Sequence, residues 1–278
     1  MTRKEILFLT IKAAIEAGEE ILKIYDTDFE VDYKADESPL TLADKAAHEI
    51  IAEQLKKTDI PVLSEEGKHL PYSTRKNWEQ LWIVDPLDGT KEFVKRNGEF
   101  TVNIALVEKN QPKMGVIFCP TLKILYFADY SIGGAFKIVF NDKVSNHGFT
   151  LDSLLEESKQ LPLDKPDDVF TVVASRSHLT EETKAYVSEI EKQVGKIQFV
   201  SRGSSLKLCM VAEGAAELYP RFAPTSEWDT AAGQAIVENA GGKVVVPDDY
   251  TPMKYNKENI LNSWFLVIGK DVESKINI

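Results

Sequence analysis

Apolar residues near the start of the chain recur every three or four positions, which predicts an amphipathic helix over residues 3–25. Thr2 and Glu5 have the spacing of a capping box at the beginning of this helix. A second helix is predicted to begin near Thr41, because the apolar positions that follow again fall on one face. The first half of the chain therefore begins with two helices, each with one apolar face.

Short apolar runs separated by brief turns follow over residues 62–140, which favours an antiparallel sheet with helices packed on it. The predicted strands are Val62–Ser64, Leu81–Val84, Phe100–Val107, Met114–Phe118, Ile124–Ala128 and Ala135–Phe140. Beyond the polar segment Asn141–Asp168, strands and helices alternate, which is typical of an α/β layer. The predicted elements there are Val169–Ala174, Ile197–Val200, Ala215–Tyr219, Val244–Val246 and Phe265–Ile268 as strands, with Glu181–Gln193, Ser205–Ala212 and Trp228–Ala240 as helices.

The order of strands and helices thus differs between the two halves of the chain, which predicts an α/β protein with two domains. We expect an α+β N-terminal domain over residues 1–160 and an α/β C-terminal domain over residues 161–278. The first domain carries most of the acidic residues that are candidates for chemistry.

Composition and charge restrict the classes of ligand. The chain has 278 residues, of which 43% are hydrophobic and 28% charged, so it has the composition of a globular protein. Its formal net charge is −11, which excludes a general electrostatic footprint for a nucleic-acid polymer or an anionic membrane. An anionic ligand would need positive charge from a few local groups.

Two cysteines, Cys119 and Cys209, are too few for a disulfide framework, and no Cys/His cluster has the spacing of a zinc site. No apolar stretch is long enough to span a bilayer, so no integral membrane association is expected. Arg3 and Lys4 precede an apolar stretch, but charged residues follow it at once and no small-residue cleavage site is present. We therefore reject a signal peptide and expect a cytoplasmic protein in a reducing compartment.

Two carboxylates, Asp85 and Asp88, directly follow an apolar strand within the run Trp82–Thr90. A proline and an Asp-Gly pair in the same run are also typical of a turn, so a purely structural interpretation stays open on this run alone. Against that interpretation, a carboxylate at the end of an apolar strand is costly without a positive partner.

Acidic residues follow apolar segments elsewhere in the chain as well. Glu65 and Glu66 come after a short apolar run, and Asp229 lies at the beginning of a small-residue helix, where it is also a candidate N-cap. Acids from three separated segments that converge without histidine or cysteine would form an all-oxygen site. Oxygen ligands suit hard divalent cations, above all Mg²⁺.

The pair Glu65–Glu66, the run Asp85–Thr90 and the run Trp228–Gly233, in this order, resemble the inositol monophosphatase superfamily, a group of Mg²⁺-dependent, lithium-sensitive phosphomonoesterases. The resemblance covers nearly the whole chain. Within the superfamily, four further segments are similar to the CysQ-type 3′(2′),5′-bisphosphate nucleotidases, namely Gly89–Phe93, Arg96–Asn103, Gly203–Lys207 and Tyr219–Phe222.

The resemblance implies a layered αβαβα sandwich of the inositol monophosphatase and sugar phosphatase type, with the active site between the two domains. It also implies two or three bound Mg²⁺ ions. Glu66 is expected to support the metal ligands through a hydrogen bond or a water molecule rather than to bind an ion directly. The implied metal ligands are Glu65, Asp85, Asp88, Asp229 and the backbone carbonyl of Leu87.

Asp44 lies three residues after Thr41, so capping of the second helix is one interpretation of it. The resemblance implies that Asp44 also pairs with the Thr90 hydroxyl to orient and deprotonate the nucleophilic water. The backbone amides of Gly89 and Thr90 are expected to point at phosphate oxygens, because glycine lets the backbone approach closely. Lys91 is a candidate substrate contact, with a solvated helix turn as the alternative.

A bisphosphate substrate needs a second anion site that does not react. Ser204 lies in a turn that leads into a helix, and Lys207 places a positive charge in the first turn of that helix, against its dipole. Arg221 follows a predicted strand and has the geometry for bidentate phosphate binding. The resemblance implies that Ser204, Lys207 and Arg221 hold a 5′-phosphate, with a solvated surface role for Lys207 and Arg221 as the alternative. His178 is a candidate for lining the nucleotide pocket, with a surface position as the alternative.

The resemblance therefore implies a Mg²⁺-dependent phosphomonoesterase that hydrolyses the 3′-phosphate of adenosine 3′,5′-bisphosphate to AMP and phosphate, with a metal-activated water as nucleophile. It extends the expected substrates to 3′-phosphoadenylyl sulfate and links the enzyme to sulfur metabolism. The expected partners are small nucleotides and not nucleic-acid polymers; loose attachment to the inner membrane face is compatible with the family but has no support in the sequence.

Two alternatives remain at the level of sequence. An inositol or sugar monophosphatase on the same scaffold would share the metal site but would not need Lys207 and Arg221. More remotely, the chain could be a non-catalytic nucleotide-binding regulator, although the full set of acids argues against a dead enzyme.

Overall fold

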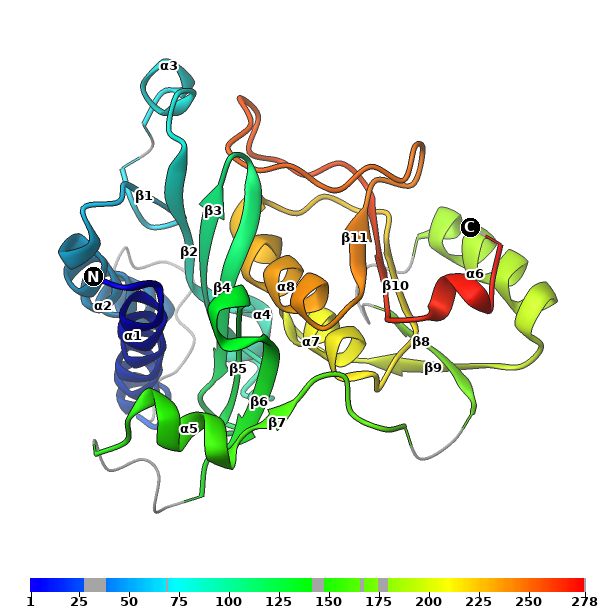
Figure 1. Ribbon diagram of the computed structural model, residues 1–278, viewed down its shortest axis with the longest axis horizontal. Helices are drawn as coiled ribbons and strands as arrows, with labels where there is room; N and C mark the ends of the chain where they lie inside the picture. The colour runs from blue at the N-terminus through cyan, green and yellow to red at the C-terminus, as the bar shows by residue number, and fades with distance from the viewer. Residues whose placement is uncertain (28–38, 69, 142–147, 166–167, 175–179, 278) are drawn as a thin grey trace.

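Alternating layers of helices and sheets make up the protein, in the order helix, sheet, helix, sheet, helix (Figure 1). The computed structural model describes residues 1–27, 39–68, 70–141, 148–165, 168–174 and 180–277. The layered αβαβα sandwich expected from the sequence is confirmed.

The first two layers come from the N-terminal half. The helices α1 (Arg3–Tyr25) and α2 (Pro39–Leu55) pack against each other and cover one face of a seven-stranded sheet. In sheet order the strands are β1 (Val62–Ser64), β2 (Gln80–Asp88), β3 (Thr101–Glu108), β4 (Gln111–Cys119), β5 (Ile124–Asp129), β6 (Gly134–Val139) and β7 (Lys159–Gln160). Strand β1 is parallel to β2, and all other pairs are antiparallel.

The central layer consists of α7 (Leu206–Glu213) and α8 (Glu227–Asn239), which lie between the two sheets (Figure 1). In sheet order the five strands of the second sheet are β11 (Lys243–Val245), β12 (Phe265–Ile268), β10 (Leu218–Arg221), β8 (Phe170–Ala174) and β9 (Ile197–Ser201). Strands β8 and β9 run parallel, as do β8 and β10, whereas β12 is antiparallel to both of its neighbours. The outer layer is α6 (Glu181–Val194).

Burial on both faces of the first sheet explains its nearly continuous apolar strands. Successive side chains of a strand point to opposite faces. In β4, Val116 and Phe118 pack into the core beneath α1, whereas Ile117 and Cys119 pack into the core shared with α7 and α8. The sheet is therefore the wall that separates two apolar cores.

Short elements complete the described chain. Three helices of seven residues or fewer are α3 (Tyr72–Arg75), α4 (Thr90–Val94) and α5 (Leu151–Glu157). Three 3₁₀ turns lie at Lys56–Thr58, Tyr130–Ile132 and Val272–Ser274. None of the helices in the described ranges is long and apolar enough to cross a membrane.

Of the three predicted helix caps, the structure confirms the one at the first helix and contradicts the other two. The capping box of Thr2 and Glu5 is present at α1. The helix α2 already begins at Pro39, so Asp44 lies well inside it and the capping interpretation of Asp44 is wrong. In α8 the N-cap is Ser226, and Asp229 is the third residue of the helix, whose carboxylate accepts from the Ser226 N–H at 2.7 Å.

Other differences concern strand direction and short segments. The first sheet is antiparallel, as the sequence predicts, except at β1, because strand direction depends on the path of the intervening chain rather than on local pattern. The strand predicted at Ala215–Tyr219 lies later, at Leu218–Arg221. The predicted boundary between residues 160 and 161 falls between the two sheets, and the division into two domains stays a prediction.

Candidate functional site

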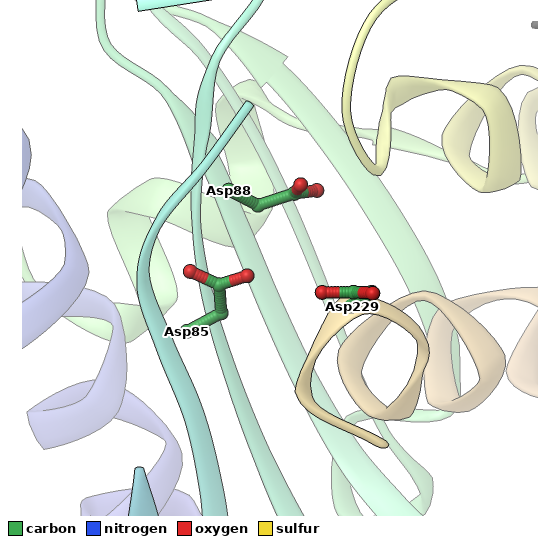
Figure 2. A group of neighbouring side chains, drawn as sticks. All are labelled: Asp85, Asp88 and Asp229. Carbon is green, nitrogen blue, oxygen red and sulfur yellow. The ribbon is translucent and has the colours of Figure 1, made fainter. Parts of the chain in front are cut away.

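Three carboxylates from distant parts of the chain converge on one space. Asp85 and Asp88 come from the end of β2, and Asp229 comes from the first turn of α8 (Figure 2). One oxygen atom from each of these side chains lies within 4.8 Å of the others. The structure thus brings together three of the acids that the sequence nominated as metal ligands.

A bulge in β2 places both of its acids on one face. Residues three apart in a regular strand point to opposite faces of the sheet. Here Asp85 pairs with Asn103 and Asp88 pairs with Thr101, so three steps along β2 match two steps along β3. The extra residue restores a common face for the two carboxylates. The run is therefore a bulged strand as far as Asp88, and the turn is confined to Gly89, which leads into α4.

Negative charge is concentrated where these three side chains meet. Among the described residues, no lysine or arginine forms an ion pair with Asp85, Asp88 or Asp229. Burial, followed by the charges of Asp88 and Glu65, raises the pKa of Asp85 well above its ordinary value. Burial and the charge of Asp88 raise the pKa of Asp229 to about 7. An all-oxygen, uncompensated cluster of this kind fits a hard divalent cation.

Glu65 and Glu66 approach the cluster from β1. The N–H of Glu65 donates to the Val84 carbonyl at 3.1 Å, which places Glu65 beside the end of β2. Desolvation and the charge of Asp88 raise the pKa of Glu65. The Glu65 carboxylate stands outside the close group of three, and the role of Glu65 as a ligand and of Glu66 as its support stay predictions.

Asp44 faces the same acids from α2. Its side chain is buried, and its Oδ1 has no hydrogen-bond partner. Burial, followed by the charges of Glu66 and Glu65, raises the pKa of Asp44 to about 8. Thr90 is the first residue of α4, which contacts α2, but within the described residues no hydrogen bond joins Thr90 to Asp44. Their predicted partnership stays a prediction.

A cleft opens beside the carboxylates and contains many of the predicted substrate contacts. The predicted residues that line it are Asp88, Gly89, Lys91, Ser204, Lys207, Arg221 and Asp229. Gly89 leads into α4 with φ +98°, and an added Cβ would lie 3.2 Å from the Phe100 Cα, so this turn requires glycine. Thr90 is not among the lining residues, although it follows directly.

Lys207 is a buried cation at this cleft. It is only 8% exposed, and its Nζ donates to the carbonyl oxygens of Ser204 at 2.6 Å and Arg202 at 3.2 Å. Burial lowers the pKa of Lys207 to about 8, while the charge of Asp88 opposes this shift. The alternative of a solvated surface lysine is therefore wrong.

Arg221 supplies a second cation to the cleft. It is half-buried at the end of β10, where its Nη2 makes a long contact of 3.4 Å with the Pro224 carbonyl. Its Nε is buried without a hydrogen-bond partner. Because a buried donor without a partner is costly, Arg221 is suited to receive an anion from the cleft.

Ser204 has a different contact from the one expected. Its backbone has φ +53°, and its Oγ donates to Oδ2 of Asp88 at 2.6 Å. The same hydroxyl lies 2.5 Å from the Thr101 hydroxyl. Its side chain is therefore engaged with the acidic cluster, and its contact with a phosphate stays a prediction.

Sequence reasoning missed the polar residues that hold Asp88. Asn103 and Ser205 are each 1% exposed, and both hydrogen-bond to Asp88. Asn103 is a polar residue between the apolar neighbours Val102 and Ile104, which was the available signal for it. Thr225 and Phe265 line the cleft without any local signal, whereas Tyr219, which also lines it, belongs to the segment Tyr219–Phe222 that the sequence singled out.

The histidines do not join the acidic cluster within the described residues. His48 Nδ1 lies 2.9 Å from the Ser64 Oγ, and burial lowers its pKa. His178, the candidate for lining a nucleotide pocket, lies outside the described residues.

Comparisons with known proteins identify one family over nearly the whole chain. The sequence profile of the inositol monophosphatase family matches residues 2–270. The chain is 45% identical over 265 residues to the 3′(2′),5′-bisphosphate nucleotidase CysQ of Salmonella typhimurium, covering 91% of this chain and 96% of that protein. It is 44% identical over 262 residues to the protein of the same name from Escherichia coli K12, with the same coverage.

Solved structures give a consistent result. The crystal structure of CysQ from Bacteroides thetaiotaomicron matches with a TM-score of 0.90 at 51% identity, covering 96% of this chain and 98% of that chain. An inositol monophosphatase from Zymomonas mobilis matches with a TM-score of 0.72 at 20% identity, covering 98% and 95%. The second similarity is evidence for the fold alone.

Proposed function

Because the chain belongs to the inositol monophosphatase family, we propose that it is a 3′(2′),5′-bisphosphate nucleotidase that hydrolyses the 3′-phosphate of adenosine 3′,5′-bisphosphate. Water supplies the oxygen of the new P–O bond, and the bond from phosphorus to the 3′-oxygen breaks. The 3′-oxygen leaves with a proton, so the products are AMP and inorganic phosphate.

The observation that carries this proposal is the separation of charge within one cleft. Asp88 and Asp229 line one part of it, whereas Lys207 and Arg221 bring positive charge to the same space. A substrate with a single phosphate does not use both parts. A bisphosphate does, with one phosphate at the acidic cluster and the other at the two cations.

The acidic cluster would hold Mg²⁺, and two or three ions are expected. Asp85, Asp88 and Asp229 supply the converging oxygens, with Glu65 and the Leu87 carbonyl as the further proposed ligands. When bound, such cations offset the charge of the phosphate dianion, acidify a water molecule and stabilise the leaving oxygen. The pKa values of Asp85 and Asp229 are raised because buried negative charges lie close together, and a bound cation would offset that repulsion.

Asp44 and Thr90 would orient the attacking water. Asp44 has a buried oxygen without a partner, and the helix that carries it contacts the helix that begins at Thr90. A proton passed from the Thr90 hydroxyl to Asp44 leaves the threonine oxygen free to accept a proton from the water.

Lys207 and Arg221 would bind the 5′-phosphate, with Ser204 at the edge of this second site. The Lys207 ammonium already donates to two backbone carbonyls, so a phosphate would add charge-assisted partners to an ordered group. The Gly89 and Thr90 amides and Lys91 are proposed to contact the reacting phosphate from α4.

A rate comparison tests the proposed function. Phosphate release in the presence of Mg²⁺ is measured for adenosine 3′,5′-bisphosphate and for inositol 1-phosphate, with and without Li⁺. We expect the higher kcat/KM for the nucleotide, and inhibition by Li⁺. A higher kcat/KM for inositol 1-phosphate would replace the proposed substrate with that of the inositol branch.

We also propose a second substrate, a class of partner and a cellular location. 3′-Phosphoadenylyl sulfate carries the same 3′-phosphate and is expected to be a second substrate. The net charge of −11 supports a small nucleotide rather than a nucleic-acid polymer as partner. A cytoplasmic location is proposed because Cys119 and Cys209 are free thiols, as is usual in a reducing compartment.

A further inference from the structure

Asp88 is held by donors on one of its two oxygens only. Oδ2 accepts from the Ser204 hydroxyl at 2.6 Å, from the Ser205 hydroxyl at 2.8 Å and from Asn103 Nδ2 at 3.4 Å. No described residue donates to Oδ1. Because a carboxylate oxygen with three donors is fixed in place, the other oxygen is left as the one available to a cation.

Ser205 connects the two halves of the acidic cluster. Its Oγ lies 2.8 Å from Oδ2 of Asp88 on β2 and 2.9 Å from the backbone carbonyl oxygen of Asp229 on α8. Asn103 Nδ2 donates to the same Oγ at 2.9 Å. The single hydroxyl proton goes preferentially to the carboxylate, which is the stronger acceptor. One buried side chain thus contacts both segments that supply the acids.

Ser205 makes these contacts instead of capping its own helix. It is the N-cap residue of α7, where a serine hydroxyl commonly accepts from a backbone N–H of the first turn and contributes about 1 kcal/mol. No such bond is present at Ser205, whereas Thr180 at the start of α6 accepts one from the Thr183 N–H. The Ser205 hydroxyl is therefore committed to the acidic cluster at the expense of local helix stability.

We propose that Ser205 is a positioning residue for the divalent-cation site, whose hydroxyl fixes Oδ2 of Asp88 beside the backbone of Asp229 and leaves Oδ1 of Asp88 for the cation. This inference rests on the proposed function for the identity of the cation as Mg²⁺. It assigns to α7 a task in building the metal site, in addition to the second anion site that Lys207 supplies from the same helix.

Calorimetric titration of Mg²⁺ into Ser205→Ala tests the proposal without any measurement of activity. We expect the affinity to fall about 10- to 100-fold, as for other residues that orient a metal ligand. The matched control is Thr180→Ala, which removes the hydroxyl that caps α6 by accepting from the Thr183 N–H at 3.2 Å. This control is expected to lower the thermal midpoint and to keep the wild-type Mg²⁺ affinity.

A second variant separates loss of the donor from a folding defect. Ser205→Cys keeps the shape of the side chain with a larger atom in place of the oxygen, and it offers only a weak donor, so its Mg²⁺ affinity should also fall. Its thermal midpoint without Mg²⁺ measures any loss of stability separately. Wild-type affinity in Ser205→Cys or in Ser205→Ala would overturn the proposal.

The outcome also separates this inference from the proposed function. Wild-type protein that binds Mg²⁺ but releases no phosphate from adenosine 3′,5′-bisphosphate would remove the proposed function, while the affinity comparison would still decide the role of Ser205. Wild-type protein that takes up no Mg²⁺ would overturn both.

Discussion

At the scale of single residues, Lys207 shows how burial changes the meaning of a charged side chain. Its spacing in the sequence allowed a solvated lysine, but the structure places it almost entirely out of water, beside the acidic cluster. A buried ammonium is retained only where it has partners, and here two of its partners are backbone carbonyls. The same side chain lines the cleft.

Removing the charge of Lys207 should weaken the binding of substrates that carry a 5′-phosphate and spare those that lack it. Lys207→Met keeps most of the buried side chain but removes the ammonium, so we expect KM for adenosine 3′,5′-bisphosphate to rise about 10- to 100-fold, the loss of one charge-assisted phosphate contact. Adenosine 3′-phosphate, which lacks the 5′-phosphate, should change by less than about threefold. Lys192→Met, at an exposed position on α6, is the control and should change neither value.

Equal loss on both nucleotides would contradict the second anion site, since both share the reacting phosphate.

At this scale the sequence could predict some residues of the site and not others. Asp85, Asp88 and Asp229 stood out because acids follow apolar segments, whereas Asn103 and Ser205 act only through contacts between distant strands and helices.

At the scale of elements, the position of α8 decides the position of Asp229. The helix packs on β4 so closely that a Cβ added at Gly115 would lie 2.3 Å from the Ala232 carbonyl oxygen and 2.9 Å from the Ala235 Cβ. Only glycine lets the helix and strand approach in this way. The acidic cluster thus depends on a residue that contacts none of its members.

Gly115→Ala should therefore affect both stability and the metal site. We expect the free energy of unfolding to fall by about 1–3 kcal/mol through overpacking, and the Mg²⁺ affinity to fall because α8 must move. Denaturant unfolding and calorimetry measure the two effects. Gly195→Ala, where φ is +81° and no atom lies within 4 Å of the added Cβ, should cost stability through strain alone. Unchanged Mg²⁺ affinity in Gly115→Ala would contradict this dependence.

Periodicity predicted the long elements but not their connections. The helix at Arg3–Tyr25 has both a regular apolar face and a capping box, so two independent signals agreed. The parallel direction of β1 and the bulge in β2 have no local signature, because both depend on pairing with a neighbouring strand. The short helices α3 and α5 were missed since a single turn or two has too few positions to show a period.

At the scale of the whole molecule, the acidic cluster makes stability depend on pH and on Mg²⁺ together. Burial raises the pKa of Asp44 from its ordinary value of 3.8 to about 8, and that of Asp229 to about 7. Between the ordinary pKa of 3.8 and these raised values, the folded state binds more protons than the unfolded state. The contribution of the two carboxyl groups to stability therefore falls as pH rises from about 4 to about 8. A bound cation favours the ionised carboxylates and reverses the penalty.

Thermal unfolding of metal-free protein at pH 5 and pH 8, with and without Mg²⁺, measures this linkage. The rise in thermal midpoint on addition of Mg²⁺ should be larger at pH 8 than at pH 5, because at pH 5 the cation must first displace protons. Comparing the two rises cancels the contribution of groups far from the site. A larger rise at pH 5 would contradict the assignment of these carboxylates as cation ligands.

The overall fold and the family were predicted from the order of a few motifs rather than from composition or periodicity. The match of the family profile over residues 2–270 confirms that resemblance, and the layered architecture agrees with it. The site lies where the two sheets and the central helices meet, so it needs acids from both halves of the chain.

The most direct test of the whole account is the identity of the nucleotide product. Adenosine 3′,5′-bisphosphate is incubated with the protein and Mg²⁺, and the product is identified by ³¹P NMR, with a chelator as control. With the 5′-phosphate at Lys207 and the 3′-phosphate at the carboxylates, the only nucleotide formed should be adenosine 5′-phosphate, and none should form with the chelator. Release of adenosine 3′-phosphate, or no hydrolysis with Mg²⁺, would contradict the account.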